Sequence, residues 1–201
     1  MKAPFVIAIS GTSGVGKSTL IHYLLKHVEQ ATGLGMDDYE ETSTYPNSIT
    51  TWIENGANPD DFATPHLAEN LQRLRQGKSV TDPMTNEEYS ARPIIILEEP
   101  FGRERDAMRQ MIDYVVYLKI PYDLALARKI QRKVTDALSD HEFEQGMRHI
   151  STFINWYRQE GYLFYQTVND RVEANCDLVV DATQPTEDIA APLLEVIERH
   201  I

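Results

Sequence analysis

The segment GTSGVGKS, residues 11–18, constrains this chain more than any other feature of its sequence. It places Gly11 and Gly16 ahead of Lys17 and Ser18 at the spacing GxxxxGK[ST]. An apolar run, Phe5–Ile9, precedes it, and leucine and isoleucine residues recur with helical spacing after it. A strand, a glycine-rich turn and a helix in this order form a loop whose backbone encloses phosphate groups. The context therefore favours a phosphate-binding loop over a glycine-rich turn that contains a lysine by chance.

Each residue type in this loop has a predicted task. The glycines let successive backbone N–H groups point inward at phosphate oxygens, and the helix that begins near Lys17 adds its positive end. We expect the Lys17 ammonium to reach the outer phosphates and to act in catalysis, and the Ser18 hydroxyl to bind Mg²⁺. The loop residues expected to bind ATP are Gly11, Thr12, Ser13, Gly14, Val15, Gly16, Lys17, Ser18 and Thr19.

The composition limits the class of protein and its partners. The 201 residues, 42% of them apolar and 25% charged, are typical of a globular protein, and we expect residues 1–201 to form a single domain. A formal net charge of −12 disfavours nucleic acid and anionic membranes as partners. The single cysteine, Cys176, excludes an intramolecular disulfide and fits a reducing compartment. Residues 5–9 are too few for the apolar part of a signal peptide or for a membrane span, so we expect a cytoplasmic protein, of open oligomeric state.

Apolar runs alternate with helical patterns along the chain, which predicts a parallel sheet covered by helices on both faces. The expected strands are residues 5–9, 93–97, 114–118 and 177–180, with a short turn or strand through Gly33 and Gly35 toward Asp37. The expected helices are residues 17–30, 49–54, 65–77, 121–137, 141–157 and 162–172, and a last helix that ends near His200. The predicted fold class is therefore α/β, with three layers and about five parallel strands.

Two acidic pairs stand where strands are expected to end. Asp37 follows the second of these strands, and its carboxylate is the candidate base that orients an attacking hydroxyl and accepts its proton. The alternative is that Asp37 and Asp38 only cap a loop or short helix. Glu98 follows four apolar residues and is the candidate Mg²⁺-binding acid, with Glu99 as the alternative. An exposed acidic strand end would give the same pattern.

Several blocks of the chain, in order, resemble the uridine kinase and phosphoribulokinase family. These blocks are Ile7–Ser18, Asp37–Tyr39, Leu71–Val80, Ile94–Glu98, Val115–Arg132 and Asp177–Asp181, and together they cover most of the chain. The resemblance implies a P-loop NTPase fold and an enzyme that passes the γ-phosphoryl group of ATP to a hydroxyl of a small molecule, nucleoside-like or sugar-like, with Mg²⁺. It also implies a helical lid at about residues 122–160 and a substrate-side insertion at about residues 39–92.

The resemblance assigns further residues to the site. Arg128 and Arg132 lie one helical turn apart where the lid begins, and are expected to neutralise charge on the transferred phosphoryl group. A solvated basic face is the alternative. The residues expected on the substrate side are Asp38, Tyr39, Arg92 and Arg103. Gln184 and Pro185 follow the last strand, where related kinases pass backbone along the adenine.

The chain departs from the family on the acceptor side. Members that phosphorylate uridine carry Asp-x-Pro where this chain has Ala57-Asn58-Pro59, so an acid that binds ribose is missing. Glu98-Glu99 replaces the family's Glu-Gly. Two alternatives therefore stay open: a kinase of another acceptor, such as a vitamin or cofactor precursor or a sulfate nucleotide, and an ATP-binding regulatory protein without acceptor chemistry.

Overall fold

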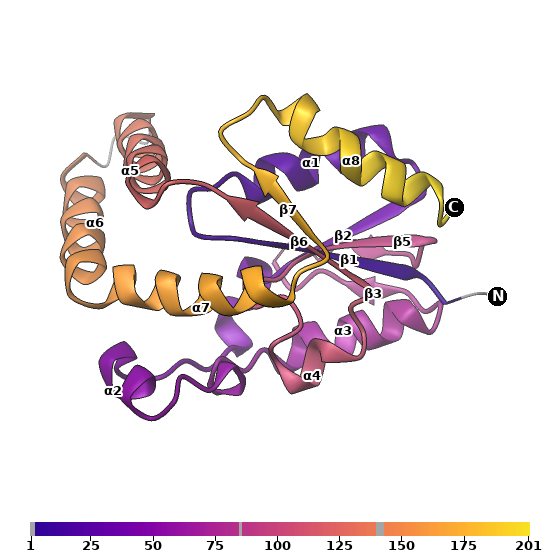
Figure 1. The fold of residues 1–201 in the computed structure, drawn as a ribbon, viewed down its shortest axis with the longest axis horizontal. Coiled ribbons are helices and arrows are strands. Elements are labelled where there is room, and N and C mark those ends of the chain that lie inside the picture. Colours follow the sequence, from indigo (N-terminus) through magenta and orange to yellow (C-terminus); the bar gives the residue numbers. More distant parts are fainter. Residues whose placement is uncertain (1–2, 85, 140–142) are drawn as a thin grey trace.

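The computed structural model describes residues 3–84, 86–139 and 143–201 (Figure 1). Five parallel strands form the central sheet, in the order β2-β5-β1-β6-β7, and two short strands form a separate antiparallel pair, β3 and β4. The strands are β1 Phe5–Ser10, β2 Ala31–Gly35, β3 Val80–Thr81, β4 Glu88–Tyr89, β5 Ile94–Glu98, β6 Tyr114–Lys119 and β7 Leu178–Asp181.

Helices cover both faces of this sheet (Figure 1). The α-helices are α1 Lys17–His27, α2 Ile49–Glu54, α3 Pro65–Arg75, α4 Asp106–Arg109, α5 Tyr122–Ser139, α6 Phe143–Trp156, α7 Tyr162–Asn175 and α8 Thr186–Glu198. Two 3₁₀ segments, η1 Asp37–Thr42 and η2 Pro59–Asp61, and one π-helical turn, η3 Tyr157–Gly161, complete the chain. Helices α1 and α8 lie on one face, and α3, α4 and α7 on the other (Figure 1). The predicted three-layer α/β fold is confirmed.

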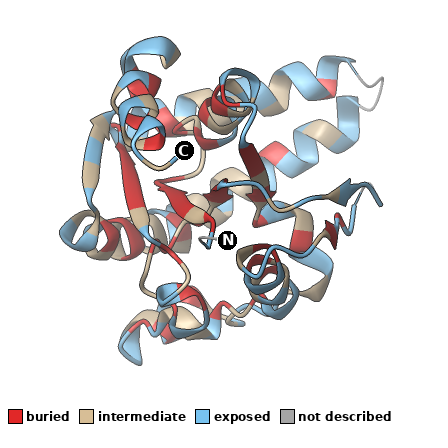
Figure 2. Ribbon diagram, turned by 90° about the vertical axis from the view of Figure 1, so that its right-hand side faces the viewer, coloured by how far each residue is buried: buried red, intermediate tan, exposed pale blue. Residues whose placement is uncertain are grey.

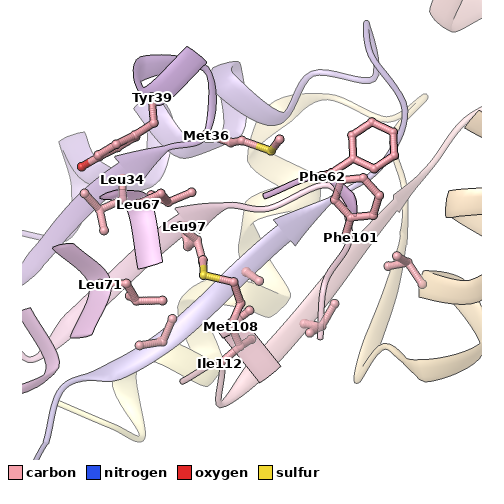
Figure 3. Packing of buried hydrophobic residues seen from close by; sticks show 14 of the residues in the cluster. Leu34, Met36, Tyr39, Phe62, Leu67, Leu71, Leu97, Phe101, Met108 and Ile112 are labelled. Carbon is pink, nitrogen blue, oxygen red and sulfur yellow. The ribbon is translucent and has the colours of Figure 1, made fainter. Parts of the chain in front are cut away.

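The central strands are apolar on both faces because each face packs against helices. Ile7 and Ile9 of β1 belong to the cluster that α1 and α8 cover, whereas Val6 and Ala8 belong to the cluster on the opposite face. Buried residues consequently concentrate in the strands at the centre of the molecule (Figure 2). Figure 3 shows the cluster on the face opposite α1 and α8, in which Leu97 of β5 lies among side chains from α3 and α4.

Most predicted elements agree with the structure, and α2 does so at both ends. Helix α1 ends at His27, three residues before its predicted end, since β2 begins at Ala31 and contains both Gly33 and Gly35. The predicted interruption between residues 157 and 162 is a π-helical turn that joins α6 to α7. The short elements α4, β3 and β4 were not predicted. The predicted start of α6 at His141 lies outside the described residues.

Helices α5 and α6 stand together at the end of the molecule remote from both termini (Figure 1). Their place in the chain is that of the expected lid, and η3 and α7 lead the chain back beneath the sheet. Within the ranges that the structure describes, no helix combines the length and apolar character that crossing a membrane requires.

Candidate active site

The loop between β1 and α1 has the backbone that the sequence pattern predicts. Gly11, Gly14 and Gly16 have φ angles of 138°, 86° and 111°, a region that residues with a Cβ rarely adopt. A Cβ added to Gly14 would lie 2.3 Å from the carbonyl oxygen of Ala125, because the first turn of α5 passes against this loop. The glycines therefore allow the curl of the loop, and Gly14 also allows its contact with α5.

Lys17, Ser18 and Glu98 form one polar cluster at the carboxyl edge of the sheet. The Ser18 hydroxyl donates to Glu98 Oε2 at 3.2 Å, and Lys17 Nζ lies 3.5 Å from Glu98 Oε1. Lys17 Nζ also donates to the carbonyl oxygens of Gly11 and Thr12, at 3.1 and 3.4 Å. A hydroxyl and a carboxylate side by side are ligands that suit Mg²⁺, which takes few protein oxygens and fills its shell with phosphate oxygens and water. In the described part of the chain, no group of three or more His, Cys, Asp or Glu side chains offers an alternative metal site.

A pocket of about 850 Å³ opens over this cluster. Its lining includes residues of the phosphate loop and of α1, namely Gly11, Ser13, Gly14, Val15, Gly16, Lys17, Ser18 and Thr19. Gln184 and Thr186 reach it from the segment after β7, whereas Thr12 and Pro185 do not line it. This volume lies within the range of pockets that bind small molecules.

Asp37 and Asp38 begin the 3₁₀ segment η1 that follows β2. Asp37 lines the same pocket as the phosphate loop, whereas Asp38 does not. The Asp38 carboxylate folds back over β2, and a Cβ on Gly35 would lie 2.6 Å from its Oδ2. Burial, followed by the negative charges of Asp82, Asp37 and Glu98, raises the pKa of Asp38. Of the two acids, Asp37 has the position that a base needs.

Helix α5 supplies the positive charge of the pocket. Arg128, Lys129 and Arg132 all line it. Arg128 Nη1 donates to the carbonyl oxygen of Ala182 at 3.0 Å and to that of Val15 at 3.4 Å, which ties α5 to the sheet edge and to the phosphate loop. Lys129 was not predicted. Burial lowers the pKa of Lys129, and the neighbouring charges of Arg132, Lys133 and Lys17 lower it further. The negative charge of Asp37 acts in the opposite direction and raises it.

The lowered pKa of Lys129 predicts how kcat/KM for ATP should depend on pH. Lysine is positive only below its pKa, so its contribution to binding ATP should be lost at a lower pH than the ordinary value of 10.5. We expect the alkaline limb of kcat/KM for ATP, which reports on the free enzyme, to move to higher pH in Lys129→Arg. Lys133→Arg, one turn further along α5, is the matched control. An unmoved limb in Lys129→Arg would show that Lys129 does not bind phosphate.

Aromatic side chains line the other end of the pocket. They come from three separate segments and comprise Tyr45, Phe62, Phe101, Trp156 and Phe164. Tyr165 also lines the pocket, but its side chain is hydrogen-bonded to Ser13 of the phosphate loop. The rings of Phe62 and Phe101 lie 5.0 Å apart, and those of Phe62 and Phe164 lie 5.2 Å apart. Burial raises the pKa of Tyr165 to about 12, so its hydroxyl stays protonated. We call Phe62, Phe101, Trp156 and Phe164 the aromatic wall.

The residues expected on the substrate side do not reach this pocket. Tyr39 is buried in the apolar cluster, and its hydroxyl accepts a hydrogen bond from Asn70. Arg92 precedes β5 and donates to the carbonyl oxygens of Glu29 and Ala31, at the amino edge of the sheet. Because strands of a parallel sheet begin at that edge, Arg92 is remote from the phosphate loop, at the opposite edge.

Arg103 is also held elsewhere. It donates to the carbonyl oxygens of Ile112 and Asp113, at 3.0 and 2.6 Å, and pairs with the Asp177 carboxylate at 2.6 Å. These contacts fasten the segment after β5 to the starts of β6 and β7. Neither Arg103 nor Asp38 lines the pocket, so the structure brings none of the residues expected on the substrate side into its lining.

The fold and the site together define a P-loop protein. A glycine-rich phosphate loop follows the central strand of a parallel sheet, with acidic residues at two neighbouring strand ends. The chain belongs to the phosphoribulokinase/uridine kinase family, whose model matches residues 6–142. Members of this family are kinases of small molecules.

A curated relative agrees with this membership, and two solved structures share the fold. The uridine kinase of Staphylococcus aureus strain JH9 is 29% identical over 147 residues, which cover 66% of this chain and 70% of the relative. A Silicibacter sp. TM1040 protein described as a fructose transport system kinase has a similar fold, with a TM-score of 0.53 and 17% identity over 90% of this chain and 91% of that protein. A gluconokinase from Sinorhizobium meliloti 1021 also has a similar fold, with a TM-score of 0.50 and 14% identity. The match covers 99% of this chain and 94% of the gluconokinase.

Proposed function

We propose that this protein is an ATP- and Mg²⁺-dependent kinase that phosphorylates a hydroxyl group of a nucleoside-like or sugar-like small molecule. The observation that carries the proposal is that one pocket is lined by the phosphate loop, by its Lys17–Ser18–Glu98 cluster and also by Asp37. A protein that only binds ATP has no need of this further acid. The names of the curated relatives, uridine kinases, agree with an acceptor of this kind.

In the proposed reaction the acceptor hydroxyl donates its proton to Asp37, and its oxygen forms a bond to the γ-phosphorus of ATP. The bond between the γ-phosphorus and the bridging oxygen breaks, which leaves ADP and a phosphorylated acceptor. Lys17, Lys129 and Arg132 stabilise the charge on the phosphoryl oxygens, and Arg128 holds α5 against the loop. Ser18 and Glu98 would hold Mg²⁺, which would supply further neutralisation of that charge.

The proposal is tested by ADP release in the presence of a panel of nucleosides, sugars and cofactor precursors. We expect at least one acceptor to stimulate ADP release well above the rate with ATP and Mg²⁺ alone. Lys17→Met is the control, because a stimulated rate that survives in it comes from a contaminant. ATP binding without stimulation by any compound of the panel would contradict the proposal and favour a regulatory protein.

A further inference from the structure

The charge of the pocket is divided between its two ends. Its positive side chains are Lys17 of α1 and three residues of α5. The segments that build the other end, residues 45–62, 98–101 and 156–169, contribute no lysine, arginine or histidine to the lining that the structure describes. They contribute two carboxylates, Glu98 and Glu160, and Glu98 faces the phosphate loop. The end that remains for an acceptor is therefore apolar and negative.

Glu160 is placed at that end by the π-helical turn η3. A π-helical turn inserts a residue into a helix and re-aims its neighbours, and such turns are frequent at functional sites. Gly161 is needed there because a Cβ would lie 2.6 Å from the Trp156 ring, which lines the pocket. The turn thus presents Trp156 and Glu160 to the same space.

The Glu160 carboxylate also accepts hydrogen bonds from residues at the start of α2. Its Oε1 accepts hydrogen bonds from the Ser48 hydroxyl, at 3.3 Å, and from the Thr50 amide and hydroxyl, at 3.3 and 3.2 Å. In the described part of the chain, all hydrogen bonds of this side chain go to Oε1. One oxygen therefore links η3 to the start of α2, and the other is available to a ligand.

The half-buried Trp156 and Phe164 supply the aromatic surface of this end, and the buried rings of Phe62 and Phe101 pack against Phe164. Phe62 and Phe101 lie next to each other in Figure 3, and Phe164 lies 6.3 Å from Phe101. The ring centres of Trp156 and Phe164 lie 6.4 Å apart, so the four rings form a continuous row of contacts. Such a surface favours a ligand with a planar or apolar ring, and it gives a phosphate group nothing to bind.

We propose that this end of the pocket binds a ring-bearing acceptor that carries hydroxyl groups but no phosphate, and that Glu160 binds one of those hydroxyls. The proposal rests on the proposed function and deepens it. A phosphate on the acceptor would lie near the Glu160 carboxylate, where the segments that line this end bring no cation, and like charges in such contacts are unfavourable. A hydroxyl that donates to Glu160 forms a charge-assisted hydrogen bond instead.

The exclusion of phosphate is tested with matched acceptor pairs in which the phosphate leaves the reacting hydroxyl free. The pairs are uridine with uridine 3′-monophosphate, and cytidine with cytidine 3′-monophosphate. We expect the unphosphorylated member to have the higher kcat/KM in each pair that reacts, by roughly tenfold or more. If the phosphorylated members react better, this inference is wrong while the kinase function stands. If no acceptor stimulates ADP release, the proposed function fails.

The role of Glu160 is tested by Glu160→Gln, which keeps the size of the side chain and removes its charge. We expect KM for the reacting acceptor to rise roughly 10- to 100-fold, with KM for ATP unchanged. The matched control is the double variant Ser48→Ala/Thr50→Val, which removes the two hydroxyl partners on α2 and keeps the carboxylate. It should leave KM for the acceptor near that of the unmodified protein.

Binding of uridine, followed by thermal shift without ATP, gives a readout that does not depend on turnover. Uridine should stabilise the unmodified protein and the double variant, and stabilise Glu160→Gln less. An acceptor KM that rises equally in Glu160→Gln and in the double variant would assign Glu160 to holding α2 alone. An unchanged acceptor KM in Glu160→Gln would overturn the assignment as well.

Discussion

Asp37→Asn should lower kcat by roughly 10²- to 10⁴-fold at saturating ATP and acceptor, the range that a general base contributes. Asparagine keeps the shape of the side chain and a hydrogen-bond acceptor, but it cannot take the proton of the attacking hydroxyl. Asp37 is the acid after β2 that lines the same pocket as the phosphate loop. KM for ATP should change little, because the loop and α5 hold the nucleotide. Single-turnover kinetics with the reacting acceptor would measure the loss in the chemical step.

Asp38→Asn is the matched control for this prediction. Asp38 is the adjacent residue with the same chemistry, but its carboxylate lies over Gly35 and away from the pocket. We expect its kcat to stay within a few-fold of the unmodified protein. If Asp38→Asn were the variant that lost turnover, the base would be Asp38 and the turn after β2 would have to rearrange on binding. Equal turnover in Asp37→Asn and the unmodified protein would remove Asp37 from the mechanism.

The half of the site that holds phosphate could be predicted from the sequence because its chemistry is local. A loop that encloses phosphate needs glycines, a lysine and a hydroxyl at fixed spacing, so Gly11–Ser18 carries its own signature. Glu98 and Asp37 could be placed because parallel strands end at one edge, and apolar runs show where the strands end. The sheet itself was predicted for the same reason.

The acceptor half is assembled from segments far apart in the chain, and this is why the sequence did not predict it. Phe62 and Phe164 are a hundred positions apart in the sequence, yet their rings lie 5.2 Å from each other. The direction of Tyr39 after the turn also could not be predicted, and it points into the core. For Glu160, the signal present was the break in helical spacing after residue 157, which the structure shows to be a π-helical turn.

The position of Arg92 shows a different limit. Its place before the middle strand already implied the amino edge of the sheet, since β5 is parallel to β1 and begins at Ile94. The backbone carbonyl oxygens that it contacts, those of Glu29 and Ala31, give it a structural role in joining the start of β2 to that of β5.

A buried ion pair, Glu99 with Arg105, joins the end of β5 to the aromatic wall. Glu99 is fully buried and Arg105 is 2% exposed. Arg105 donates to the carbonyl oxygen of Phe62, at 2.6 Å, and to the Thr64 hydroxyl, at 2.8 Å, and its guanidinium lies 5.5 Å from the Phe101 ring centre. The pair therefore fixes two rings of the acceptor end.

Removing the acid of this pair should be the most destabilising of the single changes considered. Glu99→Met leaves the Arg105 guanidinium buried without a counter-charge, and arginine does not lose its proton in proteins. Breaking a buried pair in this way costs about 3–5 kcal/mol of the free energy of unfolding. Urea unfolding followed by circular dichroism measures this loss. The double variant Glu99→Met/Arg105→Met should recover much of it, because neither charge is then buried alone.

Arg105→Met should behave differently, because a buried carboxyl group can bind a proton. Burial already raises the pKa of Glu99 above its ordinary value of 4.5, and Arg105 is what opposes that rise. Without Arg105 the folded protein holds a proton on Glu99 that the unfolded chain releases. The free energy of unfolding of Arg105→Met should therefore fall as pH rises above about 4.5, relative to the unmodified protein, and converge toward it at lower pH. A pH-independent difference between the two proteins would show that Glu99 stays charged when its partner is gone.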